Sequence, residues 1–129
     1  MPKKNKYLPT ESELEILHIL WQPEPATVRF VHEELLKVRS IGYTTTLKQF
    51  QRMTEKGILS KIADGKAHKY TTLVSSDSIQ ESLFNKLLHS AFKGSKSQLL
   101  IHALGKGETS EEELKQLEVF IQSQKKKKQ

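Results

Sequence analysis

The change from helical to strand-like sequence after Gly57 is the feature that most constrains the fold of this chain. Residues 58–62 and 68–73 are short strand candidates, and the pair Asp64-Gly65 lies between them. An Asp-Gly pair between two such segments is a strong signal for a β-hairpin. We therefore expect a hairpin near the middle of the 129-residue chain, with different structure on either side of it.

Two helices are predicted near the start of the chain. Thr10 and Glu13 have the spacing of a capping box, in which the hydroxyl accepts from the amide of the glutamate and the carboxylate reaches back. Apolar residues at helical spacing follow as far as Trp21. A second helix is expected to begin near Thr27 and to stop before Gly42.

A third helix is predicted just before the hairpin. It should open at Thr44 or Thr45 and turn Phe50 and Met53 inward, and Gly57 follows it as a C′ glycine. Three helices and a hairpin within about 65 residues are the outline of a winged helix-turn-helix. We expect residues 1–74 to form this domain.

The second half of the chain is predicted to be entirely helical. Capping boxes beginning at Ser78, Ser95 and Ser110 each precede a set of apolar residues. Three such helices bury only one face each, so they need the first half or a second copy of the chain. We expect residues 75–124 to form a helical dimerisation domain, with 125–129 as a basic disordered tail. The expected apolar seam consists of Leu83, Leu87, Leu99, Leu117 and Ile121.

Positive charge is concentrated in one part of the chain. The sequence has a formal net charge of +6, yet residues 39–74 alone carry seven bases and two acids. Such a concentration is typical of a face that binds a polyanion, although a solvated basic surface would have the same composition.

The third predicted helix carries side chains suited to the major groove of DNA. Hydroxyl groups and lysine can contact base edges or phosphates there, and a threonine methyl can pack on thymine. Arginine further along the helix suits a phosphate, and a lysine at the hairpin tip could reach the flanking backbone. The candidate DNA-binding residues are Thr44, Thr45, Lys48, Gln51, Arg52 and Lys66.

Several classes of protein are not expected from this sequence. The chain has no cysteine, which excludes a disulfide scaffold and a cysteine nucleophile. None of its five histidines lies three or four residues from another, and no glycine elbow is present, so we expect no metal, no cofactor and no catalytic site. No apolar run is long enough for a spanning helix, and the basic start lacks the apolar stretch of a signal peptide. A cytoplasmic protein without a membrane partner is expected.

An ordered set of motifs occupies residues 8–21, 25–33, 43–45, 52–57 and 64–75. Together these motifs resemble the penicillinase-repressor family of the BlaI/MecI/CopY type. The resemblance implies a bacterial repressor with an N-terminal winged helix and a C-terminal three-helix dimerisation domain. Members of the family bind pseudo-palindromic operator DNA, often with TACA/TGTA half-site cores.

The resemblance also suggests roles for particular residues. Thr44, Thr45, Lys48 and Arg52 fall in the stretch that matches the recognition helix of the family, and Lys66 falls in its wing.

The chain departs from the family pattern in its third helix. Thr46 and Gln49 stand at usually apolar positions, which predicts a less firmly packed helix, and Leu47 is expected on the DNA side.

It departs also in its second half. The paired cysteines of the copper-sensing branch are absent, and His102-Ala103 matches the position of the Asn-Phe bond that is cleaved in the antibiotic-responsive branch. A sensor protease for this chain is therefore unknown.

Two functions remain open on the sequence. One is a dimeric, sequence-specific DNA-binding repressor, and the other is a winged helix used for protein–protein contact. Salt dependence separates them, because phosphate contacts weaken steeply with salt and an apolar docking face does not. The basic segment 39–74 favours the repressor.

Overall fold

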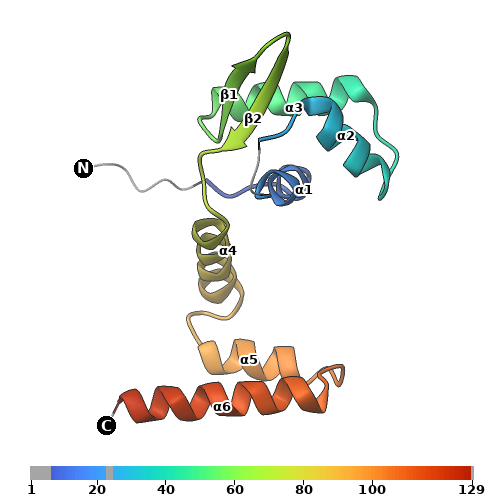
Figure 1. Ribbon diagram of the computed structural model, residues 1–129. Coiled ribbons are helices and arrows are strands. Elements are labelled where there is room, and N and C mark those ends of the chain that lie inside the picture. The colour runs from blue at the N-terminus through green and yellow to red at the C-terminus, as the bar shows by residue number, and fades with distance from the viewer. Residues whose placement is uncertain (1–6, 23–24, 129) are drawn as a thin grey trace, which may run out of the picture. The chain divides into compact units, whose positions relative to one another are not determined.

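The computed structural model describes residues 7–22 and 25–128, which form helices and one two-stranded hairpin (Figure 1). The elements, in chain order, are α1 (Glu11–Leu20), α2 (Val28–Leu36), α3 (Tyr43–Glu55), β1 (Leu59–Asp64), β2 (Ala67–Thr72), α4 (Ser76–Ala91), α5 (Lys96–Leu104) and α6 (Glu111–Lys127). The order confirms the predicted fold class, a winged helix-turn-helix followed by three helices.

The chain divides into two compact units, Met1–Asn85 and Lys86–Gln129. The division lies within α4, later in the chain than the predicted domain boundary at residue 74.

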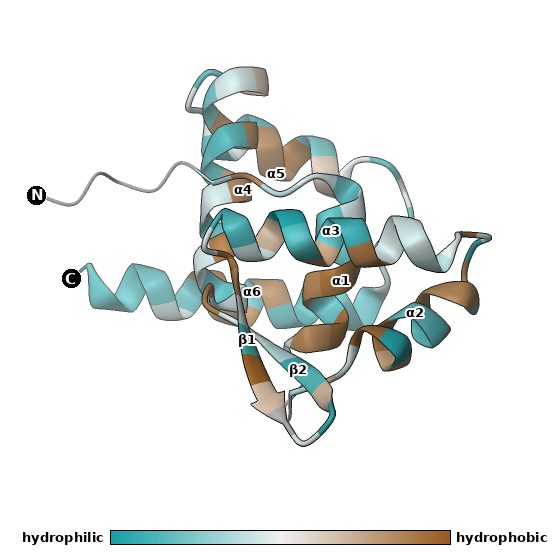
Figure 2. Cartoon of the chain, turned by 90° about the horizontal axis from the view of Figure 1, so that it is seen from above, coloured by the Kyte–Doolittle hydropathy of each residue, from teal (hydrophilic) through white to brown (hydrophobic). Residues whose placement is uncertain are grey.

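The core of the first unit is built from α1, α2, α3 and the hairpin. Its fully buried side chains include Ile16, Leu17, Val31, Phe50 and Met53. The predicted inward positions of the third helix are thus confirmed. In Figure 2, α1 appears in the brown of apolar residues, whereas much of the visible side of α3 is teal.

The capping box at the start of α1 is present and extends into a larger polar cluster. The carboxylate of Glu13 accepts hydrogen bonds from the backbone amide of Thr10 at 3.1 Å and the hydroxyl of Tyr7 at 2.9 Å. The second carboxylate oxygen of Glu13, Oε2, lies 2.9 Å from the ammonium group of Lys56, the C-cap residue of α3. Burial raises the pKa of this carboxyl, but the three hydrogen bonds and the charge of Lys56 outweigh it, so the pKa is lowered from its usual value.

We expect Glu13→Gln to remove a pH-dependent part of the stability. Because the folded pKa is depressed, the stabilisation is complete above the unfolded pKa of about 4.3 and is lost as the pH falls through the folded value. The free energy of unfolding in urea should therefore differ between wild type and variant at pH 7, and the difference should shrink below about pH 4. An equal difference at every pH would contradict this assignment.

The hairpin has a regular antiparallel register, from Leu59 opposite Thr72 to Asp64 opposite Ala67. Gly65 begins the two-residue loop with a φ of +66°, a conformation that favours glycine. Backbone hydrogen bonds between Ala26 and Tyr70 attach the segment before α2 to the hairpin. The hairpin is thereby joined to the helical part of the first unit by backbone pairing as well as by side-chain packing.

The helix starts of the second half are only partly as predicted. Ser95 and Ser110 cap α5 and α6 as expected. The box predicted at Ser78 is wrong, because Ser75 accepts the hydrogen bond from the Ser78 amide and α4 begins at Ser76.

The basic tail also differs from the prediction, since α6 continues through Lys127 where disorder was expected from residue 125. No described residue of α5 or α6 is buried. None of the helices in the described part of the chain is long and apolar enough to cross a membrane.

Candidate DNA-binding surface

α3 separates its side chains into a buried face and an exposed face. Thr46, Phe50 and Met53 have no solvent exposure. The side chains predicted to contact DNA from this helix are all exposed: Thr44, Thr45, Lys48, Gln51 and Arg52. The helical period that turns Phe50 inward therefore turns the candidate DNA-binding residues outward together.

The start of α3 is left open to a ligand. Gly42 occupies the N-cap position and provides no side-chain hydrogen bond to the helix, whereas Thr10 caps α1 and Thr27 caps α2. The first amides of an uncapped helix can donate to an anion such as a phosphate group. Thr44 and Thr45, in the first turn, add hydroxyl groups at the same end.

A buried polar pair fixes α3 against α2. Thr46 Oγ1 and His32 Nδ1 lie 3.0 Å apart, with His32 only 8% exposed. The Thr46 hydroxyl also lies 3.5 Å from the carbonyl oxygen of Gly42, to which it can donate while accepting from the imidazole. The expected loosening of α3 at position 46 is thus not observed, because the polar side chain is paired. The pair adds a polar contact between α2 and α3 inside the core.

Gln49 and Leu47 differ from each other in how they fit the helix. The side-chain oxygen of Gln49 is buried and has no hydrogen-bond partner among the described residues. A buried polar atom without a partner lowers stability, whereas the weaker packing expected at this position stays a prediction. Leu47, expected on the DNA side, is half-buried and packs against the core, so that expectation is wrong. It lies at the border between the two faces of α3.

Two residues at the start of this surface were not among the predicted sites. The ring of Tyr43, the first residue of α3, is 41% exposed and meets His32 edge-on at 5.3 Å. The guanidinium of Arg29, from α2, lies 5.7 Å from the centre of the same ring. Arg29 thus adds an exposed positive charge beside the N-terminal end of α3. The sequence shows that Tyr43 directly precedes the candidate threonines, which could have suggested it as a site residue. Its contacts with His32 and Arg29 of α2 could not be predicted from the sequence.

The hairpin adds a further cation to the same unit. Lys66 lies in the two-residue turn between β1 and β2 and is exposed. Among the described residues, the ion pairs use Lys37, Arg39 and Lys56, whereas Lys48, Arg52 and Lys66 pair with no carboxylate. Their charges therefore remain available to a polyanion.

The second unit has an apolar groove between α5 and α6, which run beside each other in Figure 1. The groove has a volume of about 490 Å³. The residues that line it are Leu100, Leu104, Leu117, Phe120 and Ile121, with Gln124 and Lys125 near the end of α6 and Lys128, its C-cap residue. Two predicted seam residues, Leu117 and Ile121, are among them. The other three are Leu83 and Leu99, which are half-buried, and Leu87, which is 48% exposed.

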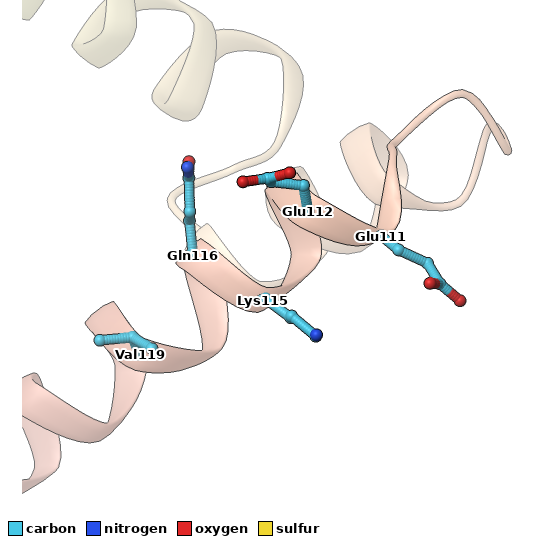
Figure 3. A pocket seen from close by; sticks show the side chains of 5 residues that line it. All are labelled: Glu111, Glu112, Lys115, Gln116 and Val119. Atoms are coloured by element: carbon cyan, nitrogen blue, oxygen red, sulfur yellow. The ribbon is translucent and has the colours of Figure 1, made fainter.

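The opposite side of α6 has a shallow hollow of a different character. Figure 3 shows its side chains leaving the helix in different directions, with Glu112 and Gln116 on one side and Glu111 and Lys115 on the other. They do not converge on a common point. This side of α6, which also includes Val119, has the features of a solvated helix face.

Comparisons with known proteins agree on one family. A sequence model described as "Penicillinase repressor" matches residues 9–123. The transcriptional regulator BlaI of Mycobacterium tuberculosis is 34% identical over 92 residues, which cover 70% of this chain and 67% of that protein. The methicillin resistance regulatory protein MecI of Mammaliicoccus sciuri is 23% identical over 108 residues, covering 84% of this chain and 88% of that protein.

Solved structures give a weaker likeness. Two mutants of Lactococcus lactis ZitR share 14% identity with TM-scores of 0.46 and 0.48, covering the whole of this chain and 81% and 82% of theirs. Scores at this level add nothing to the assignment, which rests on the family match and the relatives. From these, the chain belongs to the penicillinase-repressor family of transcriptional regulators.

Proposed function

We propose that this protein is a dimeric, sequence-specific DNA-binding repressor that occupies a pseudo-palindromic operator within a promoter. The observation that carries the proposal is the exposed face of α3. Hydroxyl groups, an amide and two cations with no ion-pair partner among the described residues lie there on one side of a helix whose start has no side-chain cap. This combination suits a helix that enters the major groove. Its family relatives are named as transcriptional regulators and repressors.

Each part of the surface has a distinct role in this proposal. Thr45 and Lys48, on the first turns of α3, contact base edges, and Lys favours guanine O6 and N7. Arg52 and Lys66 contact phosphates on either side of the groove. Two copies joined through their second units place two such helices in major grooves about one helical turn, or a multiple, apart. Occupation of the promoter then excludes RNA polymerase without any catalytic group.

Protein–protein docking through the same winged helix is the second candidate. It would be favoured by an apolar outer face on α3, but that face carries polar and charged side chains. The salt dependence of binding separates the two candidates, since each phosphate contact contributes about −0.9 to the slope of log affinity against log salt.

Lys48→Ala is expected to lower the discrimination between operator and random DNA by about 1–3 kcal/mol, because a base contact is lost. Arg52→Ala should instead weaken binding to both DNAs alike and reduce the salt slope by about one. Fluorescence anisotropy at two salt concentrations measures both effects, with DNA from upstream of the gene beside a shuffled fragment. Lys115→Ala, on the outer side of α6, is the matched control and should change neither quantity.

The same titration tests the proposal as a whole. Tighter binding of wild type to the native fragment, with a steep salt slope, is the expected result. Equal binding to both fragments would remove sequence specificity, and binding to neither would favour the docking candidate. Full discrimination by the Lys48 variant would show that the base-reading face of α3 has been assigned wrongly.

A further inference from the structure

We propose that two α6 helices pack antiparallel in the dimer, so that the acidic start of each helix lies beside the basic end of the other. This proposal rests on the dimeric state proposed above and adds the relative direction of the two copies. It also assigns a role to the lysine run at residues 125–128.

The two ends of α6 carry opposite charge. Glu111, Glu112 and Glu113 form its first turn, and Lys125, Lys126 and Lys127 form its last turn, all of them exposed. None of these six takes part in an ion pair of the described residues. The helix has 17 residues, which at 1.5 Å per residue separates its ends by about 25 Å. That separation exceeds the screening length of about 8 Å at physiological salt, so the ends hardly interact within one helix.

An apolar face lies between these charged ends. Leu114, Leu117, Phe120 and Ile121 follow at helical spacing, and they are between 36% and 60% exposed in the single chain. Leu117 and Ile121 line the groove beside α5, and Lys125 lies at the same groove. An uncovered face of this kind is stabilised when a partner removes it from water.

A second copy of the same helix fits this face in one direction. In a dimer with two-fold symmetry, the same surface patch of each copy contacts its equivalent on the other copy. The symmetry axis therefore passes through the midpoint of the patch. With the axis at the level of residue 119, an antiparallel partner places Leu117 level with Ile121. It also brings the glutamate-bearing end of one helix level with the lysine-bearing end of the other. Glu111 and Glu112 lie on the side of α6 away from the groove and add to the charge of that end at longer range. Apolar contact at the centre and opposite charges at both ends are thereby satisfied together.

The parallel alternative is disfavoured by the same charges. It would place three glutamates beside three glutamates at one end and lysines beside lysines at the other. Like charges brought together in this way oppose association. The charge pattern therefore selects the direction, while the apolar face supplies most of the attraction.

The end charges also stabilise α6 by itself, because acids at the start and bases at the end of a helix complement its dipole. That effect belongs to a single chain and needs no partner. The two roles give different results when the charges are exchanged between the ends, which makes the proposal testable.

The test uses three charge-reversal variants of the full chain, with dimer dissociation measured by sedimentation equilibrium at low and high salt. The first variant carries Glu111→Lys, Glu112→Lys and Glu113→Lys, the second carries Lys125→Glu, Lys126→Glu and Lys127→Glu, and the third carries all six changes. Antiparallel pairing predicts that each single-end variant dissociates at least about tenfold more readily at low salt, because the attraction between the oppositely charged ends becomes a repulsion. The six-change variant should return to nearly the wild-type constant, and an equimolar mixture of the two single-end variants should form heterodimers.

Other results would overturn the proposal. If the end charges act only through the helix dipole, the six-change variant should be the weakest dimer and the least helical by circular dichroism. Unchanged dissociation in all variants would exclude any role of these charges in pairing. Wild type that sediments as a monomer would contradict the dimeric repressor itself, whereas a wild-type dimer insensitive to these changes would contradict only the antiparallel arrangement.

Discussion

Phe50→Ala is expected to lower the free energy of unfolding by about 3–5 kcal/mol, because it removes a fully buried aromatic ring from the centre of the first unit. The ring contacts Tyr70 edge-on, with 4.9 Å between the ring centres, and so connects α3 to the hairpin. A small domain has about 5–15 kcal/mol of stability in total, so this loss leaves little reserve. Urea denaturation followed by circular dichroism measures it.

Phe30→Ala is the matched control for that change. Phe30 belongs to the same unit, but its ring is 47% exposed on α2, so the same truncation should cost less than about 1 kcal/mol. A similar decrease in the free energy of unfolding of both variants would show that Phe50 is not more deeply buried than Phe30. DNA binding by the Phe50 variant should fail at temperatures where the first unit unfolds and should be retained below them.

If the second units pair as proposed, Leu117→Asp is expected to convert the proposed dimer to monomer and to remove specific operator binding. A carboxylate at this position must lose its water when the apolar groove is covered, and a buried unpaired charge is strongly unfavourable. A monomer contacts only one half-site, so its affinity should fall towards the non-specific range, with a dissociation constant of about 10⁻⁴–10⁻⁶ M. Sedimentation and anisotropy on the same sample measure both changes.

Val119→Asp provides the comparison on the same helix. Val119 is 70% exposed and lies in the hollow shown in Figure 3, away from the groove of Leu117. The variant should keep the oligomeric state and the DNA affinity of wild type. Loss of dimer in both variants would indicate a general effect on α6, and loss in neither would remove Leu117 from the interface.

Much of the first unit was predictable because its signals are local. Each signal involves only a few neighbouring residues. The start of α1 is predicted by Thr10 with Glu13, the start of α2 by Thr27, and the hairpin by the Asp64-Gly65 pair. The structure confirms all three. The start of α4 was misplaced for a local reason as well. Ser75 and Ser78 both have cap chemistry, and only the backbone conformation selects between them.

The lysine run shows a different limit of sequence patterns. A block of like charge at a chain end is typical of disorder, yet these lysines continue a helix whose dipole favours positive charge at its last turn. The charge of this segment was identified correctly, but its helical conformation depends on the preceding turns of α6, which it continues.

The candidate surface was predictable only as a face of one helix. The period of α3 placed Phe50 inward and Lys48 outward, and both positions agree with the structure. Contacts between helices were not predictable in this way, because periodicity describes one element at a time. The pairing of Thr46 with His32, and the stacking of Arg29 on Tyr43, depend on how α2 and α3 cross.

The hydrogen bond between His32 and Thr46 also has an evolutionary consequence. Each side chain satisfies a polar atom of the other inside the core, so an apolar residue at either position alone removes this hydrogen bond; the Thr46 hydroxyl then keeps only the carbonyl of Gly42, and His32 Nδ1 loses its partner. Replacement of both by apolar residues of similar shape carries no such penalty. Positions 32 and 46 are therefore constrained to drift together, and a lineage that exchanges one of them passes through a less stable intermediate before the second exchange restores the fit.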